Sequence, residues 1–131
     1  MATVMPLRWK IAPLEQMVVC VSEGAVTKDE LMSYFKALEE AGAAHYRKLL
    51  DASRAECGLS ADEIAELGAY AKSLKWSGTP GPMAIFTGST GNDEFVRSVS
   101  ALLRPGRRLR TFSTIHAARR WLDTAPLGRT S

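Results

Sequence analysis

Few residues of this 131-residue chain combine the type and the spacing that catalysis or metal binding requires. His45 and His116 are the only histidines, and neither has a second histidine at ligand spacing or a nucleophile paired with it in a known signature. Cys57 follows Glu56, an acidic neighbour that disfavours the reactive thiolate. These patterns indicate no catalytic residue, no metal site and no cofactor, and they predict a protein that is not an enzyme.

Composition places the chain among globular domains. Apolar residues make up 46% and charged residues 24%, which is ordinary for such proteins. The longest apolar run, MVVCV, is far too short to span a membrane, and the first ten residues hold no stretch of signal-peptide length. The two cysteines form no disulfide or metal pattern. We therefore expect a cytoplasmic protein.

Two predicted loops carry polar residues just after strands. TGSTGND, residues 87–93, has two glycines between a strand and a helix, where open α/β sheets bind ligands and helix N–H groups can hold an anion. No Lys-Ser or Lys-Thr pair follows the second glycine, so the loop is not a P-loop, and Asp93 and Glu94 repel phosphate. The loop 53–59 is expected at the same end of the sheet. An ordinary turn, with Asp51 as a turn former, is the alternative. The candidate ligand-loop residues are Asp51, Ser53, Gly88, Ser89, Thr90, Gly91 and Asn92.

Ser60 opens a predicted helix. Glu63 stands three residues later, the spacing of a capping box in which each side chain bonds a backbone N–H group at the helix start. Thr27 and Glu30 repeat this spacing before an earlier helix, which Gly42 is expected to end. A cap explains Ser60 fully, and a regulated site is the alternative.

Strand and helix patterns alternate along the rest of the chain. Strands are predicted at 7–11, 17–22, 47–53, 83–88 and 108–113, and helices begin after Thr27, after Ser60, at Thr90 or Asn92, and at Ser113 or Thr114. Short links between strand and helix imply a mostly parallel sheet with helices on its faces. The fold class is α/β, with about five strands, an antiparallel first strand and four helices, in one domain over 1–131 whose ordered core is 6–123 and whose tail, 124–131, is loose. The residues predicted to be buried together in the core are Val19, Val21, Phe35, Leu49, Leu50, Leu67 and Ile85.

The layout and a few short patterns resemble a known family. VSEGAVTKDEL, KLLDAS and TFSTIHAARRWL are similar to segments of bacterial SpoIIAA-like proteins of the STAS superfamily, which share features with Sec14-type lipid-binding domains. The resemblance covers roughly residues 7–123 and implies a SpoIIAA-like fold. It also implies a phosphorylated serine switch near Ser60. The regulated relatives have an aspartate–serine pair followed by a glycine, whereas this chain has CGLSADEI, with the glycine before Ser60.

Charge is divided unevenly along the chain. Residues 1–96 hold 9 Lys and Arg against 13 acidic residues, and residues 97–131 hold 8 Arg against the single acid Asp123. Such asymmetry can mark an anion-binding or partner surface, and its alternative is a solvated face whose arginines pair with the glutamates of the first two helices. Few aromatic residues stand among these arginines, which argues against a nucleic-acid partner. The candidate patch comprises Arg104, Arg107, Arg108, Arg119 and Arg120.

Two functions remain open from the sequence. The first is a non-catalytic, STAS-like regulatory or binding module for a protein partner or a small ligand, as a monomer or a homo-oligomer. The second is a small carrier of lipids or other apolar ligands of the Sec14 type, or an enzyme without a recognisable motif. Cavity size distinguishes them, because a carrier needs a cleft of about 300 Å³ or more. A chain of this length predicts no large internal cavity.

Overall fold

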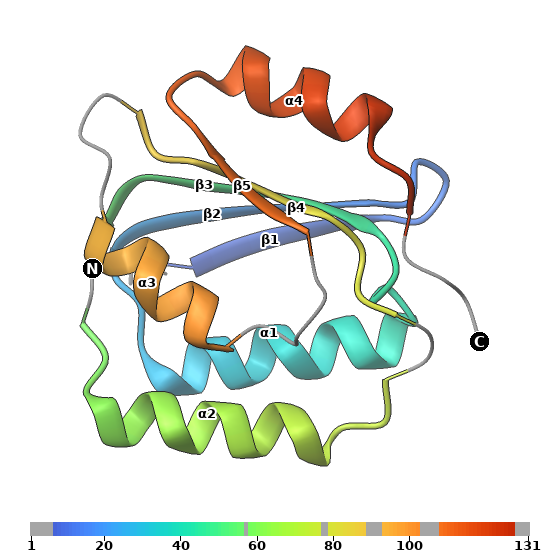
Figure 1. The fold of residues 1–131 in the computed structure, drawn as a ribbon. Coiled ribbons are helices and arrows are strands. Elements are labelled where there is room, and N and C mark those ends of the chain that lie inside the picture. The colour runs from blue at the N-terminus through green and yellow to red at the C-terminus, as the bar shows by residue number, and fades with distance from the viewer. Residues whose placement is uncertain (1–6, 57, 77–78, 89–92, 103–107, 128–131) are drawn as a thin grey trace, which may run out of the picture.

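The computed structural model describes residues 7–56, 58–76, 79–88, 93–102 and 108–127. These residues form five strands and four helices, which alternate after an initial strand pair, as the sequence predicts (Figure 1). The elements are β1 (Leu7–Ala12), β2 (Met17–Ala25), α1 (Lys28–Ala41), β3 (Arg47–Glu56), α2 (Ala61–Ser73), β4 (Met83–Phe86), α3 (Asp93–Leu102), β5 (Leu109–Phe112) and α4 (Ile115–Thr124).

The strands form one sheet in the order β1-β2-β3-β4-β5. β1 pairs with β2 in antiparallel fashion, and the other three pairs are parallel, which confirms the predicted fold class. Helices α1, α2 and α3 connect the parallel strands and lie on one face of the sheet, whereas α4 lies on the other (Figure 1). The helical cover is therefore unequal, with three helices on one face and one on the opposite face.

Capping side chains account for where α1 and α4 begin. The Thr27 hydroxyl accepts a hydrogen bond from the Glu30 N–H at 3.2 Å, and the Glu30 carboxylate accepts one from the Thr27 N–H at 3.0 Å. The Thr114 hydroxyl accepts from the Ala117 N–H at 3.2 Å. Gly42 ends α1 in the left-handed conformation, with φ 63°. The predicted caps at 27 and 114 and the predicted stop at 42 are thus confirmed, while Thr90 and Asn92 lie outside the described residues.

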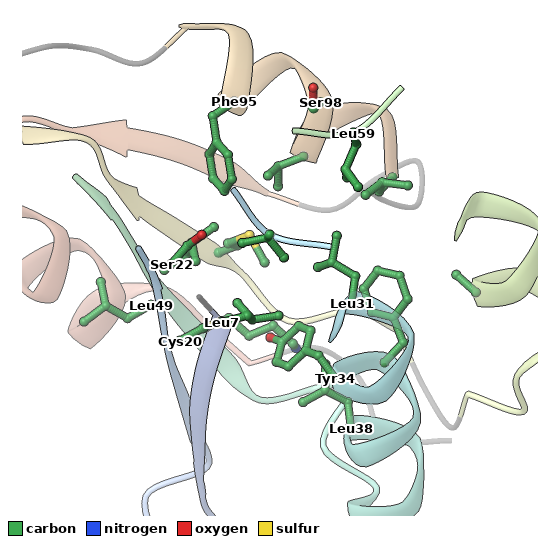
Figure 2. Close-up of a pocket in the computed structure, with 18 of the residues that line it drawn as sticks. Leu7, Cys20, Ser22, Leu31, Tyr34, Leu38, Leu49, Leu59, Phe95 and Ser98 are labelled. Carbon is green, nitrogen blue, oxygen red and sulfur yellow. The ribbon is translucent and has the colours of Figure 1, made fainter. Parts of the chain in front are cut away.

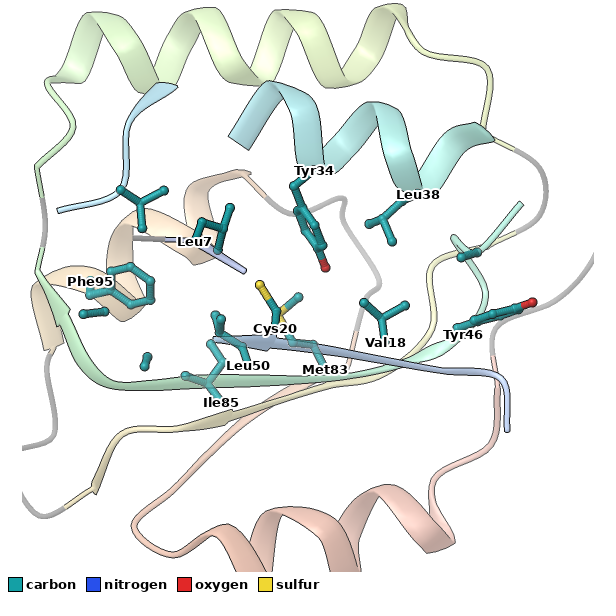
Figure 3. Packing of buried hydrophobic residues seen from close by; sticks show 14 residues of the cluster. Leu7, Val18, Cys20, Tyr34, Leu38, Tyr46, Leu50, Met83, Ile85 and Phe95 are labelled. Atoms are coloured by element: carbon teal, nitrogen blue, oxygen red, sulfur yellow. The ribbon is translucent and has the colours of Figure 1, made fainter. Parts of the chain in front are cut away.

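The core is divided by the sheet. Leu50 and Ile85 point toward α1, where they pack in one cluster with Cys20, Tyr34 and other buried residues (Figure 3). Leu49, one position earlier on β3, points to the opposite face and packs with residues of α4 in a second cluster. Successive side chains of a strand point to opposite faces, so a single core containing both leucines is impossible.

The prediction that Val19 and Val21 are buried is wrong. Both are only partly buried, whereas Val18 and Cys20 on the alternate positions of β2 are 0% and 4% exposed. The reason is the position of α4, which packs mainly against β3, β4 and β5 and leaves this side of β2 only partly covered. Phe35 is also only partly buried, while Leu49, Leu50, Leu67 and Ile85 are buried as predicted.

β3 and the end of α4 extend further than the sequence indicates. β3 continues through Glu56, so the first half of the predicted loop 53–59 is strand. After a register shift between Val21 and Glu23, the end of β2 pairs with Arg54–Glu56, which prolongs the ladder. Beyond α4, Ala125 is buried and its carbonyl oxygen accepts a hydrogen bond from Arg47 Nε at 3.0 Å. The first residues of the predicted tail are therefore fixed to the sheet.

Candidate functional site

Helices α1, α2 and α3 leave an apolar cavity of about 120 Å³ against the sheet. Figure 2 shows Leu7, Cys20 and Ser22 on the strand side and Leu31, Tyr34 and Leu38 of α1 opposite them. Phe95 of α3 and Leu59, just before α2, contribute further apolar surface. The volume agrees with the prediction of no large internal cavity, because pockets for drug-sized ligands begin at about 300 Å³.

The strand side of the cavity follows from the alternation of β2. Val18, Cys20 and Ser22 occupy every second position, so all three side chains point toward the helices. Leu7 of β1 pairs with Ser22, and Leu50 of β3 pairs with Cys20. The serine therefore stands in a row of apolar side chains at the level where β1 begins.

Two groups of β2 are polar yet buried at this surface. Burial raises the pKa of the Cys20 thiol from 9.0 to about 12, because an apolar surrounding disfavours the thiolate. The Ser22 side chain is 1% exposed, and its Oγ has no hydrogen-bond partner among the described residues. The thiol is therefore protonated at neutral pH, and no described residue uses the capacity of the hydroxyl to donate and accept.

Lys48 is the only positively charged residue among the described residues that line the cavity, and it is 1% exposed. Its Nζ donates to the carbonyl oxygens of Ala44 at 2.7 Å, Tyr46 at 3.0 Å and Ala43 at 3.4 Å. An ammonium group has three protons, so these acceptors occupy all of its donors. The charge of Lys48 thus holds the loop after α1 and is not directed at a ligand.

The cavity reaches the surface beside the end of β3. Glu56 and Gly58 are the exposed residues among those described that line it. The acidic side chain of Glu56 gives this opening a negative charge. An anionic molecule would meet that charge on entry and would find the donors of Lys48 already bonded.

The candidate ligand-loop residues occupy a different place. Asp51 Oδ1 accepts hydrogen bonds from the Ser53 N–H at 3.1 Å and the Ser53 hydroxyl at 2.7 Å. Gly88, with φ 71°, approaches Ser53 so closely that an added Cβ would lie 3.3 Å from the Ser53 Cβ. Asp51 and Ser53 therefore lie within β3, which continues to Glu56, and Ser53 meets Gly88 just after β4. The turn expected at Asp51 is not formed, because the strand runs on past it. These three residues do not line the cavity, and residues 89–92 lie outside the described part of the chain.

Ser60 forms a complete capping box. Its hydroxyl accepts from the Glu63 N–H at 3.1 Å, and its own N–H donates to the Glu63 carboxylate at 3.1 Å. Asp62 and Glu63 both stand in the first turn of α2. The hydroxyl is thus engaged at the helix start, beside two acidic residues.

Of the candidate arginines that the structure describes, Arg108 and Arg120 each have a polar partner. Arg108 donates to the carbonyl oxygen of Pro126 at 2.7 Å, and Arg120 lies 2.8 Å from His116 Nε2. Arg119 lines a surface hollow of about 480 Å³ on the α4 side of the sheet, together with Lys10. Arg104 and Arg107 lie outside the described residues. The anion-binding role of these arginines stays a prediction.

Ion pairing between these arginines and the first two helices does not occur among the described residues. The ion pairs there are Arg8–Glu23, Lys28–Glu66 and Lys36–Glu40. Arg119 and Arg120 stand on α4, across the sheet from α1 and α2 (Figure 1). The sheet therefore separates these two arginines from the acidic helices.

Sequence reasoning missed Ser22 and Lys48. Both are polar residues within apolar strands, and only the alternation of each strand could have indicated that they point inward with Cys20 and Leu50. That signal is weak, because a polar residue in a short apolar run more often faces solvent.

Comparison with known proteins supports the fold. The sequence matches no protein-family model, and it matches no curated protein. Among solved structures, the chain is similar to an uncharacterised protein of the DUF3478 family with a SpoIIAA-like fold from Shewanella loihica PV-4. The two share 18% sequence identity with a TM-score of 0.58, over 93% of this chain and 98% of the other. This chain therefore has a SpoIIAA-like fold. Within the described residues, no helix is long and apolar enough to cross a membrane.

Proposed function

We propose that this protein is a non-catalytic binding module that takes a small, mainly apolar ligand into the cavity between the sheet and helices α1, α2 and α3. The observation that carries the proposal is the cavity itself, whose walls come from all three helices and from the sheet. Concave, mostly apolar sites with few polar groups are typical of small-molecule binding.

The size of the cavity limits the ligand. An apolar cavity of about 150 Å³ is known to bind benzene, so a cavity of 120 Å³ suits a molecule of about one aromatic ring or a short chain. A phospholipid is far larger. The size favours a small-ligand module over a Sec14-type lipid carrier.

The polar groups of the cavity support a role in binding. The raised pKa of Cys20 keeps its thiol protonated at neutral pH, and a thiol is a poor nucleophile compared with a thiolate. Ser22 Oγ has no base within hydrogen-bond reach among the described residues. An activated nucleophile needs such a base or a lowered pKa. A protein partner, the other part of the expectation from sequence, stays a prediction.

A titration with toluene tests this function. Toluene should shift the amide NMR signals of cavity residues in a saturable way. Ala71 of α2 lines the cavity, so Ala71→Leu should fill part of it and weaken toluene binding. Ala69→Leu, on an exposed position of the same helix, is the matched control and should leave binding unchanged. The proposal fails if wild type shows no saturable shift, or if the two variants bind toluene equally well.

A further inference from the structure

Ser22 is an exception among buried polar side chains. Most buried hydroxyl groups have a hydrogen-bond partner, because leaving one without a partner in an apolar surrounding costs free energy. Ser22 Oγ has none among the described residues, although its side chain is 1% exposed and lines the cavity. A partner supplied from within the cavity would remove this cost.

The second serine of the cavity is satisfied. The hydroxyl of Ser98, on α3, donates to the Glu94 carbonyl oxygen of its own helix at 3.1 Å. The donors of Lys48 are occupied by three carbonyl oxygens. Among Ser22, Ser98 and Lys48, Ser22 is therefore the lining side chain that has no hydrogen-bond partner among the described residues.

Charge further restricts what can bind Ser22. An ionised group carried into an apolar cavity is costly unless a counter-charge pairs with it, and Lys48 is already bonded. Glu56 at the opening repels anions. The raised pKa of Cys20 reflects the same apolar surrounding. A ligand that reaches Ser22 should therefore be neutral.

We infer that Ser22 is the polar contact of the cavity, and that the site selects small neutral molecules with an apolar body and one hydroxyl-type group. This inference rests on the proposed function. A hydroxyl of the ligand would donate to or accept from Ser22 Oγ, while its apolar body lies among Leu7, Leu31, Tyr34 and Phe95 (Figure 2).

Phenol and toluene test the inference, because they differ by a hydroxyl in place of a methyl group. The quantity to measure is the ratio of the toluene Kd to the phenol Kd, obtained by NMR titration of each variant. Ser22→Ala should lower this ratio by about 2- to 10-fold, the effect of one net hydrogen bond. Ser98→Ala is the matched control and should leave the ratio unchanged. Each variant is first confirmed to be folded by its NMR spectrum.

The outcomes separate this inference from the proposed function. If both probes bind wild type and Ser22→Ala leaves the ratio unchanged, the polar contact is wrong and the apolar site stands; an ordered water bonded to Ser22 would give this result. An equal drop in Ser98→Ala also overturns the inference, because the effect would not be specific to Ser22. If neither probe binds wild type, the inference and the proposed function both fail.

Discussion

The ammonium group of Lys48 donates a 2.7 Å hydrogen bond to the carbonyl oxygen of Ala44, from a side chain that is 1% exposed. The same group donates to Tyr46 and Ala43 in the loop that follows α1. Carbonyl oxygens near a helix C-terminus carry partial negative charge and favour a cation. Lys48 thus joins β3 to the end of α1 beneath the cavity.

Replacing Lys48 with methionine should destabilise the protein. Without the ammonium group, the Ala43 carbonyl oxygen still accepts from the Tyr46 N–H, and the Ala44 carbonyl oxygen still accepts from the Gly81 N–H. The Tyr46 carbonyl oxygen is therefore the acceptor most affected by the loss of Lys48. One unsatisfied buried group costs about 1–3 kcal/mol, and this is the expected decrease in the free energy of unfolding. Urea denaturation measures it. Lys36→Met, the same change at an exposed lysine, should stay within about 0.5 kcal/mol of wild type. Equal stability of the two variants would contradict this role of Lys48.

Replacing each of two glycines with alanine should change the free energy of unfolding in opposite directions. A Cβ at Gly81 would overlap the backbone carbonyl groups of Tyr46 and His45, whereas a Cβ at Gly68 in α2 would meet no atom within 4 Å. Gly81→Ala should therefore lower the free energy of unfolding by about 1–3 kcal/mol through overpacking. Gly68→Ala should raise it by about 0.5–1 kcal/mol, because alanine favours the helix interior. Thermal unfolding of both variants checks the pair, and a destabilised Gly68→Ala would contradict the helix argument.

The fold was predictable because local signals agreed. Capping boxes at Thr27 and Ser60 mark two helix starts, and alternating strands and helices with short links imply the parallel sheet. Local signals do not show which strands each helix covers on either face of the sheet. MVVCVS is apolar on both sides, yet α4 packs mainly against β3, β4 and β5, so Val18 is buried and Val19 is only partly buried.

The cavity was less predictable than the fold. It depends on how closely three helices approach the sheet, which the apolar stripe of each helix does not determine. Ser22 lies just where the β2–β3 register shifts, between Val21 and Glu23. Pairing registers between strands about 30 residues apart arise from tertiary packing, so the unpartnered hydroxyl could be recognised only in the folded chain.

The Ser60 cap makes a separate prediction. Ser60→Ala should lower the free energy of unfolding by about 0.5–2 kcal/mol, because the Glu63 N–H loses its acceptor. Ser60→Asp should be close to neutral, because aspartate is an equally good cap. Chemical denaturation of both variants provides the measurement. Loss of a partner protein in Ser60→Asp at unchanged stability would instead favour a phosphorylation switch at this position.

Burial of Cys20 predicts a loss of stability in alkaline solution. The unfolded thiol releases its proton near pH 9, whereas the folded thiol, with a pKa of about 12, keeps it. Between these values the native state binds more protons than the unfolded state, so the free energy of unfolding falls as pH rises. The expected loss from this group is about 2 kcal/mol at pH 10.5 and at most about 4 kcal/mol by pH 12.

Cys20→Ala isolates this contribution. Lysines and tyrosines also titrate above pH 9, and they do so equally in both proteins. The difference in the free energy of unfolding between wild type and Cys20→Ala should therefore shrink, and can change sign, as pH rises from 8 to 10.5. Urea denaturation at several pH values under reducing conditions gives this difference directly. Parallel profiles over that range would show that the Cys20 thiol ionises as easily in the folded protein as in the unfolded chain, and that this side of β2 is open to water.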